Sequence, residues 1–185
     1  VKMRTQFLLA TAGVLAAFAL SPPGMAQAPS QSAATAKPSS AISAADRKFV
    51  ETAGEAGLAE VEMAKAAQQR GAGTEVKSFA DRMVADHGKA NEELKSIATT
   101  KGITVTDKLS AKDSRELAKL QKLDAAKFDK AYVSSQVAAH KDAVKLFKKE
   151  SASGKDAELK TFATSTLPTL QEHLTMITTM AKNKH

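Results

Sequence analysis

Three of the four histidines in this 185-residue sequence lie on the apolar faces of three different predicted helices. His87, His140 and His173 each follow large apolar residues at intervals of three or four, which is the spacing of one helical face. A buried imidazole needs partners for both ring nitrogens, and one left unsatisfied costs about 1–3 kcal/mol. Histidines that face a core therefore need a carboxylate, another polar group or a metal ion beside them.

The helical rise of about 1.5 Å per residue places these rings at similar depths. His87 lies about 21 Å beyond the first predicted tight turn, and His140 lies about 21 Å before the second. His173 is about one helical turn deeper, and Glu60, on the apolar face of the first helix, is about 18 Å from its turn. We predict that Glu60, His87, His140 and His173 form one polar layer, with one residue from each helix.

Two interpretations of this layer stay open at the level of sequence. Imidazole and carboxylate ligands together suit a divalent transition metal such as Zn, Fe, Ni or Cu. The alternative is a buried hydrogen-bonded network that fixes helix register, with Glu60 paired to an imidazolium. Asp86 and Glu62 are close in sequence to inward residues, but their positions predict that both face outward.

Methionines accompany two of the histidines at helical spacing. Met176 and Met180 follow His173 by three and seven residues, and Met83 precedes His87 by four. Thioether and imidazole ligands together suit copper(I), although methionine at this spacing also fills apolar cores. The sequence has no glycine-rich phosphate loop, no serine nucleophile motif and no cysteine, so we predict no catalytic residue and no organic cofactor site.

Long amphipathic segments carry these residues, and tight turns containing glycine separate two pairs of them. A short helical segment precedes the third long one, Pro168 is predicted to kink the fourth, and strand patterns are nearly absent. We therefore predict an all-α fold, an antiparallel four-helix bundle with a short extra helix before the third long helix. The predicted long helices span about 45–70, 74–101, 126–152 and 156–182.

The N-terminal segment has the features of an export signal. Lys2 and Arg4 precede an apolar run at 7–20, which is short for a membrane span, and Gly24 and Ala26 supply the small residues before a cleavage site. We predict a signal peptide over residues 1–26, cleaved after Ala26, with an uncleaved anchor as the alternative. The protein is then periplasmic or secreted.

The segment that follows is predicted to be an Ala/Ser/Pro-rich disordered linker over residues 27–43, ahead of a folded domain over 44–183. No cysteine is present, which excludes lipid attachment through cysteine and disulfide bonds. Removing Lys2 and Arg4 from 27 basic residues leaves 25 against 20 acidic ones, a net charge of +5. The charges alternate in sign without interleaved aromatic residues, so we expect a solvated surface and no nucleic-acid binding.

Several segments resemble the bacterial "domain of unknown function 4142" family. The similarity covers about residues 49–181 and is carried by 55–62, by 76–94 with Asp86-His87, by 128–133, by His140, and by 159–174 with Leu167-Pro168. The resemblance implies a ferritin-like four-helix bundle that is exported and has no established activity. The di-iron Glu-x-x-His pattern is absent, because Val84, Val137 and Leu170 occupy the positions three before the histidines.

We therefore expect an exported helical-bundle protein that binds a metal ion through Glu60, His87, His140 and His173, without enzymatic activity. An envelope or stress-related role is implied by the resemblance alone. A ferritin-like, metal-dependent redox enzyme is one alternative. A structural module whose basic surface binds anionic envelope polymers is the other.

Overall fold

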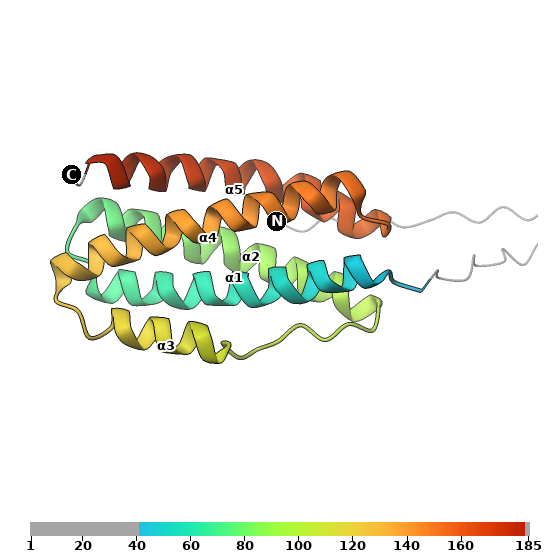
Figure 1. Ribbon diagram of the computed structural model, residues 1–185, viewed down its shortest axis with the longest axis horizontal. Coiled ribbons are helices and arrows are strands. Elements are labelled where there is room, and N and C mark those ends of the chain that lie inside the picture. Colours follow the sequence, from blue (N-terminus) through green and yellow to red (C-terminus); the bar gives the residue numbers. More distant parts are fainter. Residues whose placement is uncertain (1–40, 184–185) are drawn as a thin grey trace, which may run out of the picture. The chain divides into compact units, whose positions relative to one another are not determined.

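The computed structural model describes residues 41–183, and this part of the chain is all-α, with five helices and no strand (Figure 1). The predicted all-α class is thereby confirmed, and the short helix α3 precedes the third long helix as expected. None of the helices described is long and apolar enough to cross a membrane. The predicted signal peptide and nearly all of the predicted linker lie outside the described residues. The helices are α1 (Ala44–Arg70), α2 (Thr74–Thr100), α3 (Ala111–Leu120), α4 (Ala125–Ser153) and α5 (Ala157–Asn183).

Polar side chains define where several helices begin. Ser43 accepts a hydrogen bond from the backbone N–H of Asp46 at the start of α1, and Ser110 does the same for α3. Asp124 caps α4 through the backbone N–H of Lys127. Each cap satisfies a backbone donor that the first helical turn leaves without a partner. Pro168 lies inside α5, which continues as helix on both sides of it.

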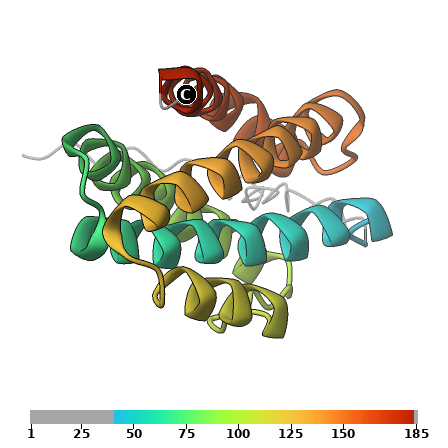
Figure 2. The same cartoon turned by 60° about the vertical axis from the view of Figure 1, so that its left-hand side comes forward.

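The long helices pack as two hairpins. α1 packs mainly on α2, and α4 packs mainly on α5, each pair joined by a turn of three residues. Contacts between α1 and α4 and between α2 and α5 join the hairpins, while α3 lies outside, against α1 and α4 (Figures 1 and 2). Each of the four long helices therefore presents one face to the interior.

The two hairpins carry a repeated sequence pattern at an interval of 83 residues. α5 begins and ends 83 residues after α2 begins and ends (157 minus 74, 183 minus 100). At this interval segments near the starts of α1 and α4 match in their Asp-basic-x-aromatic-Val pattern, 46–50 against 129–133. The starts of α2 and α5 match in Glu-Val-Lys-Ser-Phe-Ala against Glu-Leu-Lys-Thr-Phe-Ala, 75–80 against 158–163. The two halves of the domain are thus built on one pattern.

The matching aspartates explain why this pattern holds the hairpins together. Asp129 of α4 accepts hydrogen bonds from the backbone N–H groups of Ala72 and Gly73, at 3.1 and 2.8 Å, in the turn of the first hairpin. Reciprocally, Asp46 of α1 accepts hydrogen bonds at 2.9 and 3.0 Å from two N–H groups in the turn of the second, at 155 and 156. Each buried carboxylate therefore ties its helix to the turn of the other hairpin, and the two contacts are related by an approximate two-fold axis.

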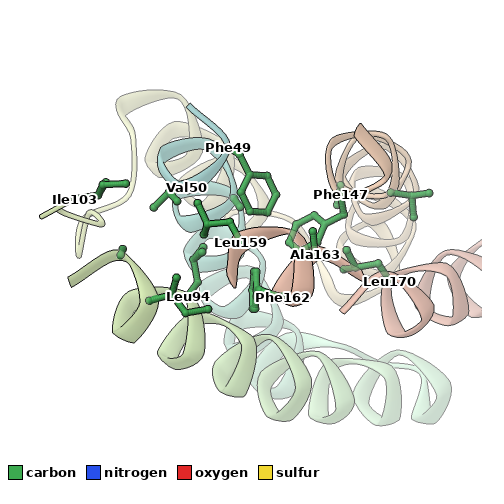
Figure 3. Close-up of a cluster of buried hydrophobic side chains, with 14 residues drawn as sticks. Phe49, Val50, Leu94, Ile103, Phe147, Leu159, Phe162, Ala163 and Leu170 are labelled. Carbon is green, nitrogen blue, oxygen red and sulfur yellow. The ribbon is translucent and has the colours of Figure 1, made fainter. Parts of the chain in front are cut away.

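The aromatic residues of the pattern obey the same relation. Phe49 and Phe162 meet edge to face with ring centroids 6.4 Å apart, and their counterparts Tyr132 and Phe79 meet in the same way at 6.4 Å. The first pair belongs to an apolar cluster that also contains Phe147 (Figure 3), and the second pair belongs to a separate apolar cluster. The polar residues described next lie between these two clusters in sequence along every long helix.

Candidate metal centre

The four polar residues predicted to share a layer all lie inside the domain. Glu60 comes from α1, His87 from α2, His140 from α4 and His173 from α5. The two rings of His140 and His173 are 0 % exposed, and Glu60 and His87 are 5 % and 6 % exposed. The depth argument from helical rise therefore predicted the right level on each helix.

The three imidazole rings form a nearly equilateral triangle. The ring centroids of His87 and His140 are 5.5 Å apart, those of His87 and His173 are 5.4 Å apart, and those of His140 and His173 are 5.5 Å apart. One ring nitrogen from each lies within 4.8 Å of the other two. Around a tetrahedral ion with Zn–N bonds of about 2.0–2.1 Å, nitrogens sit roughly 3.3 Å apart, so small ring movements close the triangle on an ion.

Each ring uses one nitrogen for a contact with a neighbouring oxygen. His87 Nδ1 lies 3.0 Å from Glu60 Oε2, and His173 Nε2 lies 2.8 Å from Asp86 Oδ2. His140 Nδ1 lies 3.0 Å from the backbone oxygen of Gln136, one helical turn earlier. In each pair the ring N–H donates, which assigns the proton to that nitrogen.

The second nitrogen of every ring is buried without a hydrogen-bond partner in the part of the chain that the structure describes. These atoms are Nε2 of His87, Nε2 of His140 and Nδ1 of His173. In the neutral form of each ring the first nitrogen carries the only proton, so the second nitrogen presents a lone pair. Three buried lone pairs within one small cluster are the donor set that imidazole-ligated metals use, and the outer oxygen partners are those that orient such ligands.

The electrostatics of the cluster keep two rings neutral. Burial lowers the pKa of His140, and burial also lowers the pKa of His173 to about 4. Burial acts against the charged forms of Glu60 and His87 as well, but their mutual attraction outweighs it, so the pKa of Glu60 is lowered and the pKa of His87 is raised. The neutral forms of His140 and His173 are therefore favoured, and the charged forms of Glu60 and His87 are favoured, so a metal ion bound at His87 would displace the second proton of that ring.

Comparison with known proteins agrees with the resemblance seen in the sequence. The model of the family described as "Domain of unknown function (DUF4142)" matches residues 29–180. The chain belongs to that family. No curated protein matches the sequence.

Solved structures of similar fold have little sequence identity to this member of the family. A DUF305 fragment from Deinococcus radiodurans matches with a TM-score of 0.68 and 13 % identity, covering 78 % of this chain and 99 % of the fragment. CopM in the Cu(I)-bound form matches with a TM-score of 0.62 and 14 % identity, covering 75 % of this chain and 96 % of CopM. CopM in the Cu(II)-bound form gives 0.60 and 13 %, covering 76 % and 97 %. At these identities the likeness concerns the fold.

The structure places Asp86 differently from the sequence prediction. Its carboxylate was expected to face outward, but Oδ2 accepts from His173 Nε2 and lies 3.2 Å from Nε of Arg82. The prediction for Asp86 is therefore wrong, although its side chain remains about one-third exposed. Its position three residues after the fully buried Met83 was the signal in the sequence, because such residues share a helical face. Glu62 does point away from the cluster and pairs with Lys65.

Glu60 occupies a specific place in the cluster. Its Oε2 contacts Nδ1 of His87, and its Oε1 lies 3.5 Å from Nδ1 of His140. Both contacts are to Nδ1 atoms, whereas the Nε2 atoms of these two rings have no hydrogen-bond partner in the described part of the chain. The residues whose possible ligand atoms lie close together are the three histidines, and Glu60 contacts two of their rings.

The methionines near the histidines serve other contacts. Met83 and Met180 are buried in the apolar cluster that contains Phe79. Met176 lies at its edge, and its sulfur is 3.3 Å from Nη1 of Arg82. The pattern of methionine spacing thus reflects packing, as methionine at helical spacing commonly does.

Proposed function

We propose that this protein binds one transition-metal ion through His87, His140 and His173. The observation that carries the proposal is the set of three buried ring nitrogens that lack hydrogen-bond partners while the opposite nitrogens donate outward. In a purely structural network each unsatisfied nitrogen costs about 1–3 kcal/mol. An ion at the centre of the triangle removes that cost for all three at once.

The outer oxygens have the role of orienting the ligands. Glu60, Asp86 and the carbonyl of Gln136 hold one N–H of each ring and so direct the other nitrogen inward. Glu60 also supplies a negative charge next to a cation, which offsets part of the charge buried with the ion. Three protein ligands leave a further coordination position open, as in catalytic metal sites.

The ion that we propose to test first is copper, with zinc second. Imidazole ligands suit Cu, Zn, Ni and Fe, so the donor set does not select among them. Copper comes first because two of the solved structures with similar fold are copper-bound forms of CopM.

We propose the following organisation around this site. The four long helices form an antiparallel, ferritin-like bundle over residues 44–183, preceded by an export signal over 1–26 and a linker over 27–43. The protein then acts in the periplasm or outside the cell, in an envelope or stress-related role. The basic N-terminus with its short apolar run supports export, and the contacts of each hairpin with the other support the bundle.

The test is the metal content of protein produced without a histidine tag, followed by competition titrations with Cu²⁺ and Zn²⁺. We expect about one ion per chain, with an affinity that His140→Ala lowers by more than about 100-fold. His185→Ala is the matched control, because it removes the histidine that the proposal does not use as a ligand. Absence of a bound ion at micromolar metal, in a folded protein, would show that the rings form only a hydrogen-bonded network.

The same samples test the enzymatic alternative. A three-nitrogen site with an open position also suits a metal-dependent redox enzyme, which would turn over peroxide or oxygen when loaded with copper or iron. Turnover that disappears in His140→Ala would favour an enzyme over a binding protein. Salt-sensitive binding to anionic polymer would instead favour the interaction module.

A further inference from the structure

A cavity of about 610 Å³ opens between α1 and α4, beside the metal centre. Its walls also include residues of α2 and α5, and the first turns of α3 lie along one edge. Glu60 and His87 form part of its inner wall, so the cavity reaches the metal centre. Its volume lies within the range of about 300–1,000 Å³ typical of sites for small molecules.

Three small residues of the cavity wall stand where the other half of the repeat has large polar ones. At the 83-residue interval (140 minus 57, 173 minus 90), Gly57 matches His140 and Ala90 matches His173. Ala143 likewise matches Glu60 (143 minus 60). Gly57, Ala90 and Ala143 all line the cavity. Glu60, His140 and His173 thus have small counterparts that line the cavity, and at Gly57 the side chain of Asn91 lies against the backbone.

The wall contains a buried side-chain amide without a hydrogen-bond partner among the residues that the structure describes. Gln136 is 0 % exposed and lines the cavity, and both its Nε2 and its Oε1 lack hydrogen-bond partners in the described part of the chain. The metal centre uses only the backbone oxygen of this residue, so its amide is free for another role. A buried amide without partners costs about 1–3 kcal/mol, which a ligand with a hydrogen-bonding group would recover.

The remaining wall limits the chemistry of an occupant. Leu94, Phe147, Phe162 and Leu170 supply large apolar surfaces in the interior. At the outer edge the carboxylates of Glu55, Glu116 and Asp142 outnumber the ammonium of Lys112. An apolar body is therefore favoured inside, and an anionic group is disfavoured at the entrance.

We propose that this cavity binds a small, uncharged, mainly apolar molecule that exchanges hydrogen bonds with the side-chain amide of Gln136. The ligand sits beside Glu60 and His87 and needs no metal ion for its own binding. The proposal therefore goes beyond the metal site and does not depend on it.

The experiment compares indole with indene, which has nearly the same shape but no N–H group, as ligands of metal-free protein. Calorimetric titration or amide chemical shifts should show saturable binding of both, with indole bound about threefold to tenfold more tightly through one added hydrogen bond. Gln136→Leu should remove the preference for indole and keep the binding of indene. An unchanged preference in this variant would overturn the role of Gln136.

Filling the cavity is the second arm. Ala143→Phe places a ring into the open space and should abolish the binding of both ligands, whereas Ala126→Phe, at an exposed position of the same helix, should leave it unchanged. Circular dichroism checks that each variant folds. Wild-type protein that binds neither ligand, or an Ala143→Phe protein that folds and binds as wild type does, would overturn the proposal. Because chelator is present throughout, failure of the metal proposal would leave these results unaffected.

Discussion

The α1–α2 and α4–α5 hairpins are built on one sequence pattern, and they differ most where the chemistry lies. They share the aspartate that binds the opposite turn, the aromatic residue three positions after it, and the Lys-x-Phe-Ala sequence near the start of the second helix. They differ near the middle of each helix, where the counterparts of Glu60 and His87 at the 83-residue interval are Ala143 and Leu170. Residues that match thus hold the hairpins together, and the four polar residues of the metal centre do not match, whereas the cavity is lined by residues of both kinds.

The largest effect on stability is expected when α2 receives the residue that α5 has at the corresponding position. His87→Leu introduces the leucine found at Leu170 and leaves the Glu60 carboxylate buried without its imidazolium. We expect a loss of about 3–5 kcal/mol in the free energy of unfolding of metal-free protein, measured by urea denaturation. The double variant Glu60→Ala/His87→Leu should recover most of this loss. If the double variant is as unstable as the single one, the buried pair is not the source of the effect.

The reciprocal turn contacts should have nearly equal strength. Asp129→Ala and Asp46→Ala each remove a carboxylate that accepts two backbone hydrogen bonds, and we expect each to cost about 3 kcal/mol. Asp107→Ala, at an exposed position, serves as the control and should change stability by less than about 0.5 kcal/mol. Thermal or urea unfolding gives all three values. A large difference between the two buried aspartates would show that the two-fold relation does not extend to energetics.

Glu60 tests whether the metal centre depends on its outer contacts. Glu60→Gln keeps an acceptor beside His87 but removes the charge, and we expect metal affinity to fall by about 10–100-fold. Glu62→Gln, two positions away and paired with Lys65, should bind metal as the wild type does. Competition with a chelator of known affinity measures both. A loss far beyond 100-fold would indicate that Glu60 is itself a ligand, as first predicted from the sequence.

A buried carboxyl beside the second turn has an alanine as its counterpart beside the first. Glu150 is buried and corresponds to Ala67 at the 83-residue interval. Burial, followed by the negative charges of Asp46 and Asp156, raises the pKa of Glu150 to about 7, while Lys160 opposes the shift. The folded state therefore holds a proton that the unfolded state releases near pH 4.5. Glu150 should therefore contribute a fall in stability, on the order of 1 kcal/mol, as pH rises from about 4.5 to about 7, whereas the lowered pKa values of His140 and His173 contribute a rise toward neutral pH.

Glu150→Ala gives the second hairpin the residue of the first at this position and should remove the falling contribution from the pH dependence. The histidines of the metal centre remain in that variant and keep their own contributions to the slope. Unfolding midpoints recorded between pH 4.5 and pH 8 give the comparison. An unchanged slope in Glu150→Ala would show that this carboxyl is not the titrating group.

The smallest effect is expected at the surface contact between the hairpins. Arg82 of α2 pairs with Glu172 of α5 at 2.7 Å, but the glutamate side chain is more than half exposed. Glu172→Ala should lower the free energy of unfolding by no more than about 0.5 kcal/mol, and less in high salt. A change above 1 kcal/mol in urea unfolding would mean that Arg82 also holds Asp86 in place for His173.

Local patterns in the sequence determined the helices and the depth of the polar layer. Helix bounds follow from capping residues and from the 3.6-residue period, which are properties of neighbouring residues, and the helical rise converts sequence distance into depth. For that reason the four residues predicted to lie together do so. The repeat between the hairpins is also a property of the sequence, visible in residues 46–50 and 129–133.

Only the tertiary structure decided which atoms meet. A helical stripe predicts the side that faces inward but not the rotation of a ring, so it did not assign the free nitrogens or the contact between Asp86 and His173. The cavity likewise depends on how closely α1 and α4 approach each other, and alanines and glycines in a sequence do not reveal whether neighbours fill the space they leave. Both outcomes depend on packing among residues far apart in the chain, whereas the helices depend on residues close together.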